Sequence, residues 1–227
     1  MRRNVTGGGT RMPARPSRIV KGEAAVDLGA VFAAAASVPL IVCDVDNVLA
    51  YHAEAVCTAL NARFGTNRTV ASLMSYPFAT LLHPDEAQWL ARFSSQDQWA
   101  LNLAPDKDAI RAVAAIGGNG NKVVISSDRP AVIATASKAW LGKHGVPDYS
   151  MRFDGPGSKR AALAGCSPNA PGILIDDDPR QWLTAARAGV QVWTPKRPWT
   201  PDGWQHYPNV RVFTSWDEPL RWLKAGR

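Results

Sequence analysis

The feature that most constrains this chain is a set of short, uninterrupted apolar runs that end in polar or acidic residues. The runs within 39–43 and 172–175 are followed directly by aspartates, and the run within 122–126 is followed by Ser127. A strand with one face in water alternates between apolar and polar residues, whereas a strand that is buried on both faces does not. These runs therefore predict the central strands of a parallel sheet with helices on both faces.

The remaining patterns alternate between strand and helix, which is typical of a doubly wound α/β fold. Residues 66–105 differ, because they contain short helical pieces with many aromatic residues and no clear strand. We therefore predict a Rossmann-like core of residues 23–50 and 106–227, with a small helical cap, residues 51–105, inserted after the first strand. Further strands are expected at 151–153, 190–194 and 209–213, and helices at 24–36, 51–64, 106–116, 130–143, 158–164, 179–188 and 217–224.

The positive charge of the chain is concentrated at its start. The formal net charge is +7, and residues 1–22 hold six basic residues and no acidic one. This stretch is also rich in glycine and proline, so we expect a disordered basic arm. The rest of the chain is nearly neutral, so nucleic acid could bind only through the arm.

The cysteines and the hydropathy predict a cytoplasmic protein. Cys43, Cys57 and Cys166 are widely spaced, unlike zinc ligands or a disulfide framework, so a reducing setting fits best. The apolar stretch 30–43 resembles the core of a signal peptide, but cleavage there would fall directly before the first strand. No stretch is long and apolar enough to span a bilayer.

Two carboxylates at the end of the first strand are the first candidates for chemistry. Asp44 and Asp46 are separated by one residue. A carboxylate in this position can attack phosphorus, and a second one beside it can exchange protons with the leaving oxygen and with water. Taken alone, the pair is equally consistent with a loop turn or a helix cap.

Polar residues after the later strands extend this set. Ser127 precedes a helix start, where a hydroxyl and free backbone N–H groups suit phosphoryl oxygens, although a simple N-cap is the alternative and Ser126 is the alternative register. Lys159 could neutralise phosphoryl charge or remain a surface lysine. Three consecutive acids, 176–178, repel one another and favour a bound cation such as Mg²⁺.

The order of these motifs resembles the haloacid dehalogenase (HAD) superfamily of phosphohydrolases over residues 38–215. The resemblance implies a Mg²⁺-dependent phosphatase in which Asp44 is the nucleophile and Asp46 the general acid and base. Asn47 stands where the family more commonly has glycine. The resemblance also implies Ser127 and Lys159 as phosphate ligands, and Asp44, Asp176 and Asp177 as metal ligands. Asn47 and Arg129 are further candidates for phosphate binding, Arg129 with pairing to Asp128 as its alternative, and Asp46 is a further candidate metal ligand.

Within the superfamily, segments 44–51, 99–116 and 189–199 are most similar to 5′(3′)-deoxyribonucleotidases. That resemblance implies a cap whose aromatic residues stack on a nucleobase. The alternative is that these rings form the small core of the cap itself. Trp199 could reach the rim of the site or pack the last strand and helix. The cap candidates are Phe78, Trp89, Phe93 and Trp99.

The preferred function is therefore a 5′(3′)-nucleotidase that releases phosphate from nucleoside monophosphates. One alternative is a polynucleotide 3′-phosphatase that uses the basic arm, and another is a phosphatase of small metabolites. A non-catalytic binding or regulatory protein with the same fold is a further alternative, which the intact pair Asp44 and Asp46 disfavours. A homodimer is compatible with the sequence, and a membrane location is not expected.

Overall fold

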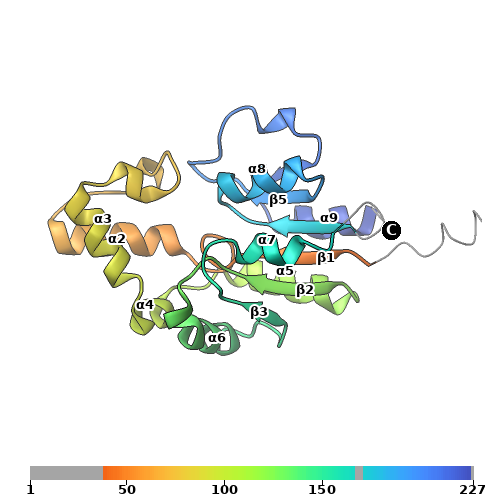
Figure 1. The fold of residues 1–227 in the computed structure, drawn as a ribbon, viewed down its shortest axis with the longest axis horizontal. Coiled ribbons are helices and arrows are strands. Elements are labelled where there is room, and N and C mark those ends of the chain that lie inside the picture. The colour runs from red at the N-terminus through yellow and green to blue at the C-terminus, as the bar shows by residue number, and fades with distance from the viewer. Residues whose placement is uncertain (1–37, 167–170, 226–227) are drawn as a thin grey trace, which may run out of the picture. The chain divides into compact units, whose positions relative to one another are not determined.

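The computed structural model describes residues 38–166 and 171–225, which include one parallel sheet (Figure 1). The strand order β3-β2-β1-β4-β5-β6 and the helices on both faces confirm the predicted doubly wound α/β fold. The arm at 1–22 and the helix expected at 24–36 lie outside the described residues. The strands are β1 (Leu40–Cys43), β2 (Lys122–Ser126), β3 (Ser150–Arg152), β4 (Gly172–Ile175), β5 (Gln191–Pro195) and β6 (Val210–Phe213).

The direction of the strand order changes beside β1. The chain proceeds from β1 through β2 to β3 on one side, and then returns to β4 on the other side of β1. Cys43, the last residue of β1, lies in register with Ile125 on β2 and Ile175 on β4. The carboxyl ends of parallel strands open a crevice at such a switch point, which is where doubly wound sheets bind ligands.

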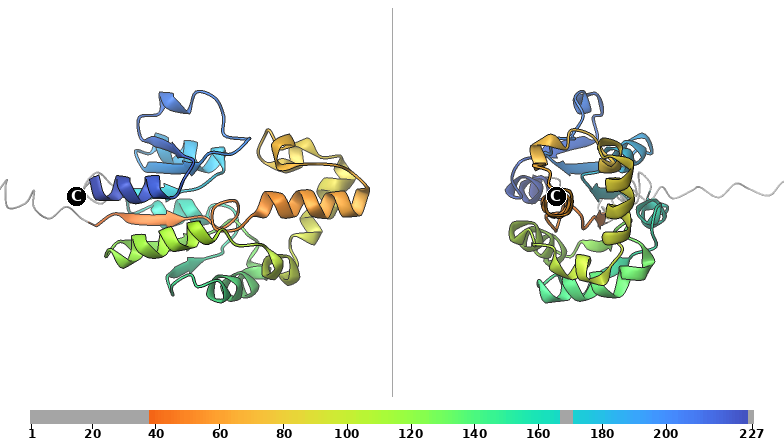
Figure 2. Two further views of the ribbon diagram at one scale, coloured as in Figure 1. Left: turned by 180° about the vertical axis from the view of Figure 1, so that it is seen from behind. Right: turned by 90° about the vertical axis from the view of Figure 1, so that its left-hand side faces the viewer.

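The apolar runs are buried on both faces of the sheet, as their composition predicts. Ile41 and Cys43 belong to a large apolar cluster on one face, and Val42 belongs to a second cluster on the other face. This alternation is the period of two expected for a strand. Helices α5 and α9 contribute to the first cluster and α7 and α8 to the second, so each pair covers one face (Figures 1 and 2).

Most element bounds lie within two residues of those expected from the sequence. The helix expected at 130–143 is an exception, because Pro130 is extended and a 3₁₀ turn precedes the α-helix. The helices are α2 (His52–Phe64), α3 (Pro84–Phe93), α4 (Asp97–Asn102), α5 (Lys107–Gly118), α6 (Ala134–Lys143), α7 (Ser158–Leu163), α8 (Pro179–Arg187) and α9 (Asp217–Ala225). Four 3₁₀ turns are η1 (Val70–Ser72), η2 (Phe78–Leu81), η3 (Ala131–Ile133) and η4 (Trp204–His206).

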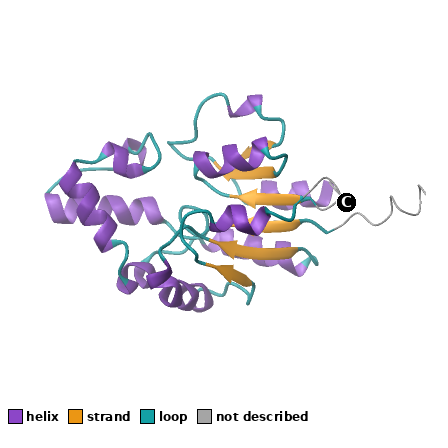
Figure 3. Cartoon of the chain, viewed as in Figure 1, coloured by secondary structure: helices purple, strands orange, loops and turns teal. Residues whose placement is uncertain are grey.

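The segment between β1 and α5 contains helices and turns beyond the carboxyl ends of the strands (Figures 1 and 3). Its two connections to the core lie side by side, because Tyr51 N–H donates to the Ala104 carbonyl oxygen at 2.9 Å and Asp106 N–H to that of Leu49 at 2.8 Å. We call residues 51–105 the cap. This boundary stays a prediction, although the paired connections lie close to both ends of the range.

Two further features concern the described residues only. None of their helices is both long enough and apolar enough to cross a bilayer. Cys43, Cys57 and Cys166 are all free thiols, and Cys43 and Cys57 are buried. Cys43 belongs to the larger apolar cluster, so it packs as an apolar side chain next to Asp44.

Candidate active site

The polar residues that follow the central strands meet at the carboxyl edge of the sheet. Asp44 follows β1, and its backbone N–H donates to the carbonyl oxygen of Ile175, the last residue of β4, at 2.9 Å. Asp176 is the next residue in the chain, so Asp44 and Asp176 are neighbours at the switch point. Ser127 follows β2, on the other side of β1. The register of the sheet therefore brings together residues that are far apart in sequence.

A cluster of buried carboxylates lies at this point. Asp44, Asp176 and Asp177 each place an oxygen within 4.8 Å of the others. All three residues are buried, and Oδ1 of Asp44 has no hydrogen-bond partner among the described residues. Because like charges repel and an unpaired buried oxygen is costly, this cluster is suited to a cation. Oxygen ligands with few carboxylates are the set that Mg²⁺ prefers.

The electrostatics of the cluster also favour a bound cation. Burial raises the pKa of Asp44 well above its ordinary value and raises that of Asp176, and in both cases Lys159 opposes the rise. Burial and the charge of Asp176 together raise the pKa of Asp177 to about 8. A divalent cation would favour the ionised forms and reverse these shifts.

Lys159 places an ammonium group between two of these carboxylates. Its Nζ lies 3.1 Å from Oδ2 of Asp44 and 2.8 Å from Oδ2 of Asp176, and the residue is 3% exposed. Burial opposes the charge, but the two aspartates raise the pKa of Lys159 well above its ordinary value. The hydroxyls of Ser158, at the start of α7, and Ser126 share a buried hydrogen bond of 2.6 Å. This bond attaches α7 to β2 and thereby fixes the position of Lys159.

Asp46 lies outside this cluster and pairs with Arg129. Nε of Arg129 donates to both carboxylate oxygens at 3.2 and 3.0 Å, and Nη2 donates to Oδ1 at 2.7 Å. Arg129 is itself buried and also donates to the hydroxyl of Ser137 at 3.0 Å. Although burial raises the pKa of Asp46, the guanidinium holds it well below its usual range. The partner of Arg129 is thus Asp46, and the expected alternative pairing with Asp128 does not form.

Ser127 lines the cavity that contains Asp44 and Lys159, and its role as a phosphate ligand stays a prediction. Its hydroxyl accepts a long hydrogen bond of 3.4 Å from the backbone N–H of Arg129. Ser126 does not line this cavity, because its hydroxyl is turned toward Ser158. The structure therefore favours Ser127 over the alternative register.

Asn47 has a different environment from the one the family resemblance suggests. Its backbone has a φ of 57°, a left-handed conformation that asparagine tolerates better than most residues. Its Oδ1 accepts from the backbone N–H of Ala53 at 2.7 Å, and its Nδ2 donates to Oδ2 of Asp177 at 3.0 Å. The side chain thus orients an acid of the cluster, and its assignment to phosphate binding stays a prediction.

The third acid of the triplet has a structural role of its own. Oδ1 of Asp178 accepts from the backbone N–H of Arg180 at 2.9 Å and caps α8. The Arg180 side chain returns to the same carboxylate, with Nη2 to Oδ2 at 2.7 Å. The guanidinium also lies over the ring of Tyr76 in the cap, 5.0 Å from its centroid. Asp178 therefore supports the link between the core and the cap.

The candidate site opens into a cavity of about 180 Å³ at the carboxyl edge of the sheet. Residues of both the core and the cap line it, whereas Asn47, Asp176 and Asp177 do not. The cap contributes His52, Tyr76, Ser94 and Trp99. The core contributes Asp44, Asp46, Ser127, Asp128, Arg129, Pro130, Ile133, Lys159, Asp178 and Arg180.

Of the four aromatic residues proposed for the cap, Trp99 lines this cavity. Phe78 is buried and packs edge-on against Trp199 of the core, with ring centroids 4.8 Å apart. Trp89 and Phe93 stack on each other at 4.6 Å and do not line the cavity. The packing alternative therefore describes these three rings better than stacking on a ligand does.

Two ring residues that the sequence reasoning missed stand at the cavity. Tyr76 lies within the aromatic-rich segment 66–105 and lines the cavity. Burial together with nearby aspartates raises the pKa of Tyr76 well above its ordinary value. His52 begins α2 and packs edge-on against Trp99 at 5.6 Å. Burial lowers the pKa of His52, which favours its neutral form. Its position directly after the first motif is the signal that could have identified it.

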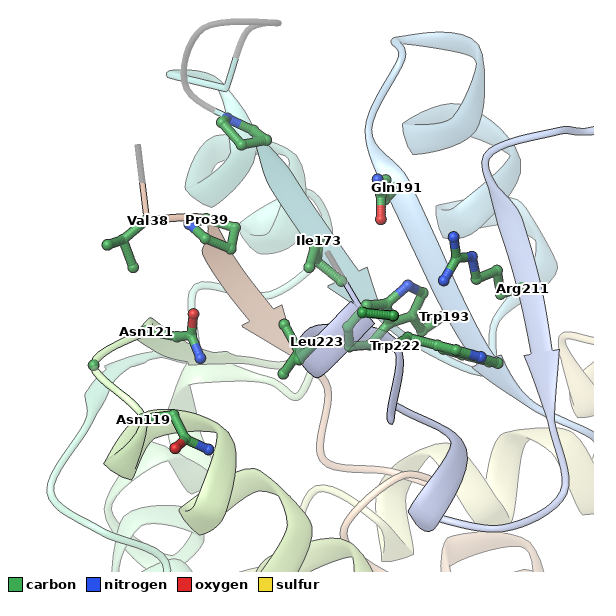
Figure 4. Close-up of a pocket in the computed structure, with 13 residues that line it drawn as sticks. Val38, Pro39, Asn119, Asn121, Ile173, Gln191, Trp193, Arg211, Trp222 and Leu223 are labelled. Carbon is green, nitrogen blue, oxygen red and sulfur yellow. The ribbon is translucent and has the colours of Figure 1, made fainter. Parts of the chain in front are cut away.

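A larger cavity, about 640 Å³, lies at the opposite edge of the sheet (Figure 4). Ile173 and Gln191 border it near the amino ends of β4 and β5, and Arg211 extends toward the ring of Trp222. No carboxylate is among the described residues that line it. Its size therefore does not make it the better candidate for phosphoryl chemistry.

Comparison with protein families agrees with this geometry. A family model described as 5′ nucleotidase, deoxy (Pyrimidine), cytosolic type C protein matches residues 37–157, more than half of the chain. The chain belongs to this family. The part matched to the type C 5′ nucleotidases contains Asp44, Asp46 and Ser127, whereas Lys159 and Asp176 lie beyond it. The sheet brings these later residues to the same site.

Comparison with solved structures shows that this member of the 5′ nucleotidase family has a HAD-type fold. A haloacid dehalogenase-like hydrolase from Streptococcus pneumoniae has a TM-score of 0.61 at 16% identity, over 82% of this chain and 98% of that one. A HAD family hydrolase from Deinococcus radiodurans with bound phosphate and sodium gives 0.61 at 16%, over 84% and 97%. Protein Tyrosine Kinase A from Mycobacterium tuberculosis gives 0.61 at 15%, over 82% and 98%. No curated protein matches the chain.

At these identities the structural likeness establishes the fold, and the kinase among the relatives shows that this fold serves more than one activity. The family match gives the class of activity. The protein is a phosphomonoesterase with a HAD-type fold, as the resemblance of its motifs predicts.

Proposed function

We propose that this phosphomonoesterase is a Mg²⁺-dependent nucleotidase that acts through an aspartyl-phosphate and prefers deoxyribonucleoside monophosphates. The observation that supports this most is the environment of Asp44. Its Oδ1 has no partner among the described residues, while its Oδ2 is held by Lys159 at 3.1 Å. One oxygen of a fixed, buried carboxylate is therefore available to attack phosphorus.

The proposed reaction has two steps on the same phosphorus atom. Oδ1 of Asp44 bonds to phosphorus as the bond to the departing oxygen breaks, and Asp46 gives that oxygen a proton. In the second step Asp46 takes a proton from water, the water oxygen bonds to phosphorus, and the bond to Asp44 breaks. Phosphate leaves, Asp44 is regenerated as a carboxylate, and Asp46 holds a proton again.

The pairing of Asp46 with Arg129 determines the protonation state of Asp46 before the substrate binds. In the structure the guanidinium favours the ionised form of Asp46, which has no proton to give. A phosphate dianion in the cavity would offer Arg129 a second anion, since both Arg129 and Ser127 line that cavity. Substrate binding would then loosen the pair and allow Asp46 to become protonated. This proposal keeps Arg129 as a phosphate ligand.

Asp44, Asp176 and Asp177 are the residues that would hold Mg²⁺, and the proximity and mutual repulsion of their carboxylates fit such an ion. The ion would neutralise charge on the phosphoryl oxygens. Lys159 contributes a further positive charge, which the helix α7 presents next to Asp44. The proposal assigns Asp46 no part in the metal site through its carboxylate, because Arg129 occupies it.

The choice of a nucleotide rests on the family and on the cavity walls. The matching family is named for deoxy pyrimidine 5′ nucleotidases, and Trp99, Tyr76 and His52 supply ring surfaces on the cap side. Stacking on such rings would hold a base while the phosphoryl group reaches Asp44. A nucleic-acid partner, a homodimer and a cytoplasmic location stay predictions from the sequence.

Phosphate release from a panel of substrates tests the proposal. The panel contains 5′- and 3′-mononucleotides, sugar phosphates and 3′-phosphorylated oligonucleotides, each with Mg²⁺ and with EDTA. Mononucleotides are expected to react fastest, and EDTA is expected to abolish release. Asp44→Asn should abolish turnover in a folded protein, whereas Asp148→Asn, at an exposed position, should leave it unchanged. Equal rates across the panel would refute the nucleotide specificity, and activity of Asp44→Asn would refute the mechanism.

A further inference from the structure

Trp199 connects the acidic cluster to the cap. Its indole Nε1 donates to Oδ2 of Asp177 at 3.1 Å and to the carbonyl oxygen of the same residue at 3.2 Å. The residue is 3% exposed. Oδ2 of Asp177 also accepts from Asn47, so two donors orient this carboxylate within the cluster. Trp199 thus contacts a candidate metal ligand directly, without itself offering a ligand atom.

The other side of the same indole packs against the cap. Its ring centroid lies 4.8 Å from that of Phe78, at an interplanar angle of 74°, and 6.4 Å from that of Tyr76. Phe78 is buried, and Tyr76 lines the cavity. Aromatic pairs at these distances and angles stabilise one another beyond simple burial. The position of the cap residues and the direction of the indole N–H are therefore linked through one rigid ring.

The turn that contains Trp199 leaves the indole little freedom. The backbone N–H of Thr200 donates to the Arg197 carbonyl oxygen at 3.0 Å, and the Arg197 N–H donates to Oγ1 of Thr200 at 2.9 Å. The guanidinium of Arg197 donates to the carbonyl oxygen of Asn47, the residue that follows Asp46. These hydrogen bonds, within the turn and from the turn to Asn47, restrict the backbone at Trp199. Movement of Phe78 would therefore be transmitted to the indole and its hydrogen bonds.

We propose that Trp199 is a positioning residue that couples metal binding at Asp177 to the seating of the cap segment 76–82 over the cavity. The inference rests on the proposed Mg²⁺ site and deepens it. When the cap is seated, Phe78 and Tyr76 hold the indole so that its N–H fixes Asp177 in the cluster. Because coupling between two sites is reciprocal, a bound ion that fixes Asp177 would in turn favour the seated cap.

Calorimetric titration of the full chain with MgCl₂, in the absence of substrate, measures the first half of this coupling. Trp199→Phe keeps a ring but removes the N–H, and it is expected to weaken Mg²⁺ binding about tenfold, the scale of a lost hydrogen bond to a metal ligand. Phe78→Leu touches no carboxylate and is expected to weaken binding about threefold. Trp216→Phe, a matched change beside Phe213, should bind as the wild type does.

The double variant tests whether Phe78 affects Mg²⁺ binding through Trp199. If Phe78 acts through the indole N–H, Phe78→Leu should have no further effect on Mg²⁺ affinity in the Trp199→Phe background. Full additivity of the two changes would overturn the proposal, as would wild-type affinity in Trp199→Phe.

Hydrogen exchange measures the reverse direction and does not depend on how well Phe78→Leu folds. Mg²⁺ should protect the backbone of residues 76–82 in the wild type, and it should protect them less in Trp199→Phe. Equal protection in both proteins would overturn the coupling. A wild type that binds no Mg²⁺ and releases no phosphate would instead refute the proposed function, so the two failures are distinguishable.

Discussion

Replacing Lys159 by methionine tests the electrostatic account of the site most directly. Methionine keeps an unbranched side chain of similar length and removes only the ammonium group. That group lies 2.8 Å from a carboxylate oxygen of Asp176 and 3.1 Å from one of Asp44, in a residue that is 3% exposed. The variant therefore leaves two buried carboxylates without the partner that opposes the rise of their pKa values.

The expected loss of stability follows from these contacts. Removing one partner of a buried ion pair costs about 3–5 kcal/mol. Against a typical free energy of unfolding of about 5–15 kcal/mol, this is a large share. We therefore expect Lys159→Met to be about 3–5 kcal/mol less stable than the wild type in the absence of metal.

The sign of the pH dependence follows from the same groups. Without Lys159, the carboxyl groups of Asp44 and Asp176 have folded-state pKa values further above those of the unfolded chain. The folded variant then binds more protons than the unfolded chain, so its stability falls as the pH rises through this range. The deficit relative to the wild type should accordingly be larger at pH 8 than at pH 5.

Urea denaturation, followed by circular dichroism, measures both effects. In EDTA the midpoint should fall without a change in slope. Saturating Mg²⁺ should restore part of the stability, about 2.7 kcal/mol at a hundredfold excess over the dissociation constant. Lys138→Met, at an exposed position on α6, should change stability by less than ~0.5 kcal/mol. If Lys159→Met in EDTA at pH 8 unfolds at the wild-type midpoint, the reasoning from buried charge is wrong.

Three other outcomes are expected. Arg129→Met should raise the pKa of Asp46, because burial remains while the guanidinium that lowers it is lost; carboxyl carbon NMR of the metal-free protein measures this, and an unchanged titration would contradict it. The pKa of Asp177 is raised to about 8, so Mg²⁺ must displace a proton from this carboxyl group at lower pH. Mg²⁺ affinity should therefore increase as the pH rises from about 6 to about 9, and binding below about pH 8 should release a proton. Calorimetry in two buffers of different ionisation heat detects that proton, and pH-independent affinity would refute the assignment. Trp99→Leu should raise KM for mononucleotides about tenfold with little effect on ribose 5-phosphate, since base stacking contributes roughly 1–3 kcal/mol; Trp89→Leu, away from the cavity, is the control, and equal effects of both would argue against stacking on Trp99.

The sequence alone determined the sheet and the edge of it where polar residues gather. The strand predicted at 172–175 and the strand predicted at 122–126 have those bounds in the structure. These predictions succeed because apolar runs must be buried, and the apolar character of a run is a local property of the sequence. The common register then brings Asp44 next to Asp176.

The tertiary structure decided the partners of these residues. The pairing of Arg129 with Asp46, the orientation of Asp177 by Asn47 and Trp199, and the presence of Tyr76 at the cavity have no local pattern. They depend on how the loops after the strands turn and on how the cap packs against the core. The ends of the strands follow from the extent of the apolar runs in the sequence. The partner of a side chain depends instead on the packing of segments that are distant in the sequence. For that reason the sequence points to the chemistry, whereas the packed cap and loops decide which residues can reach it.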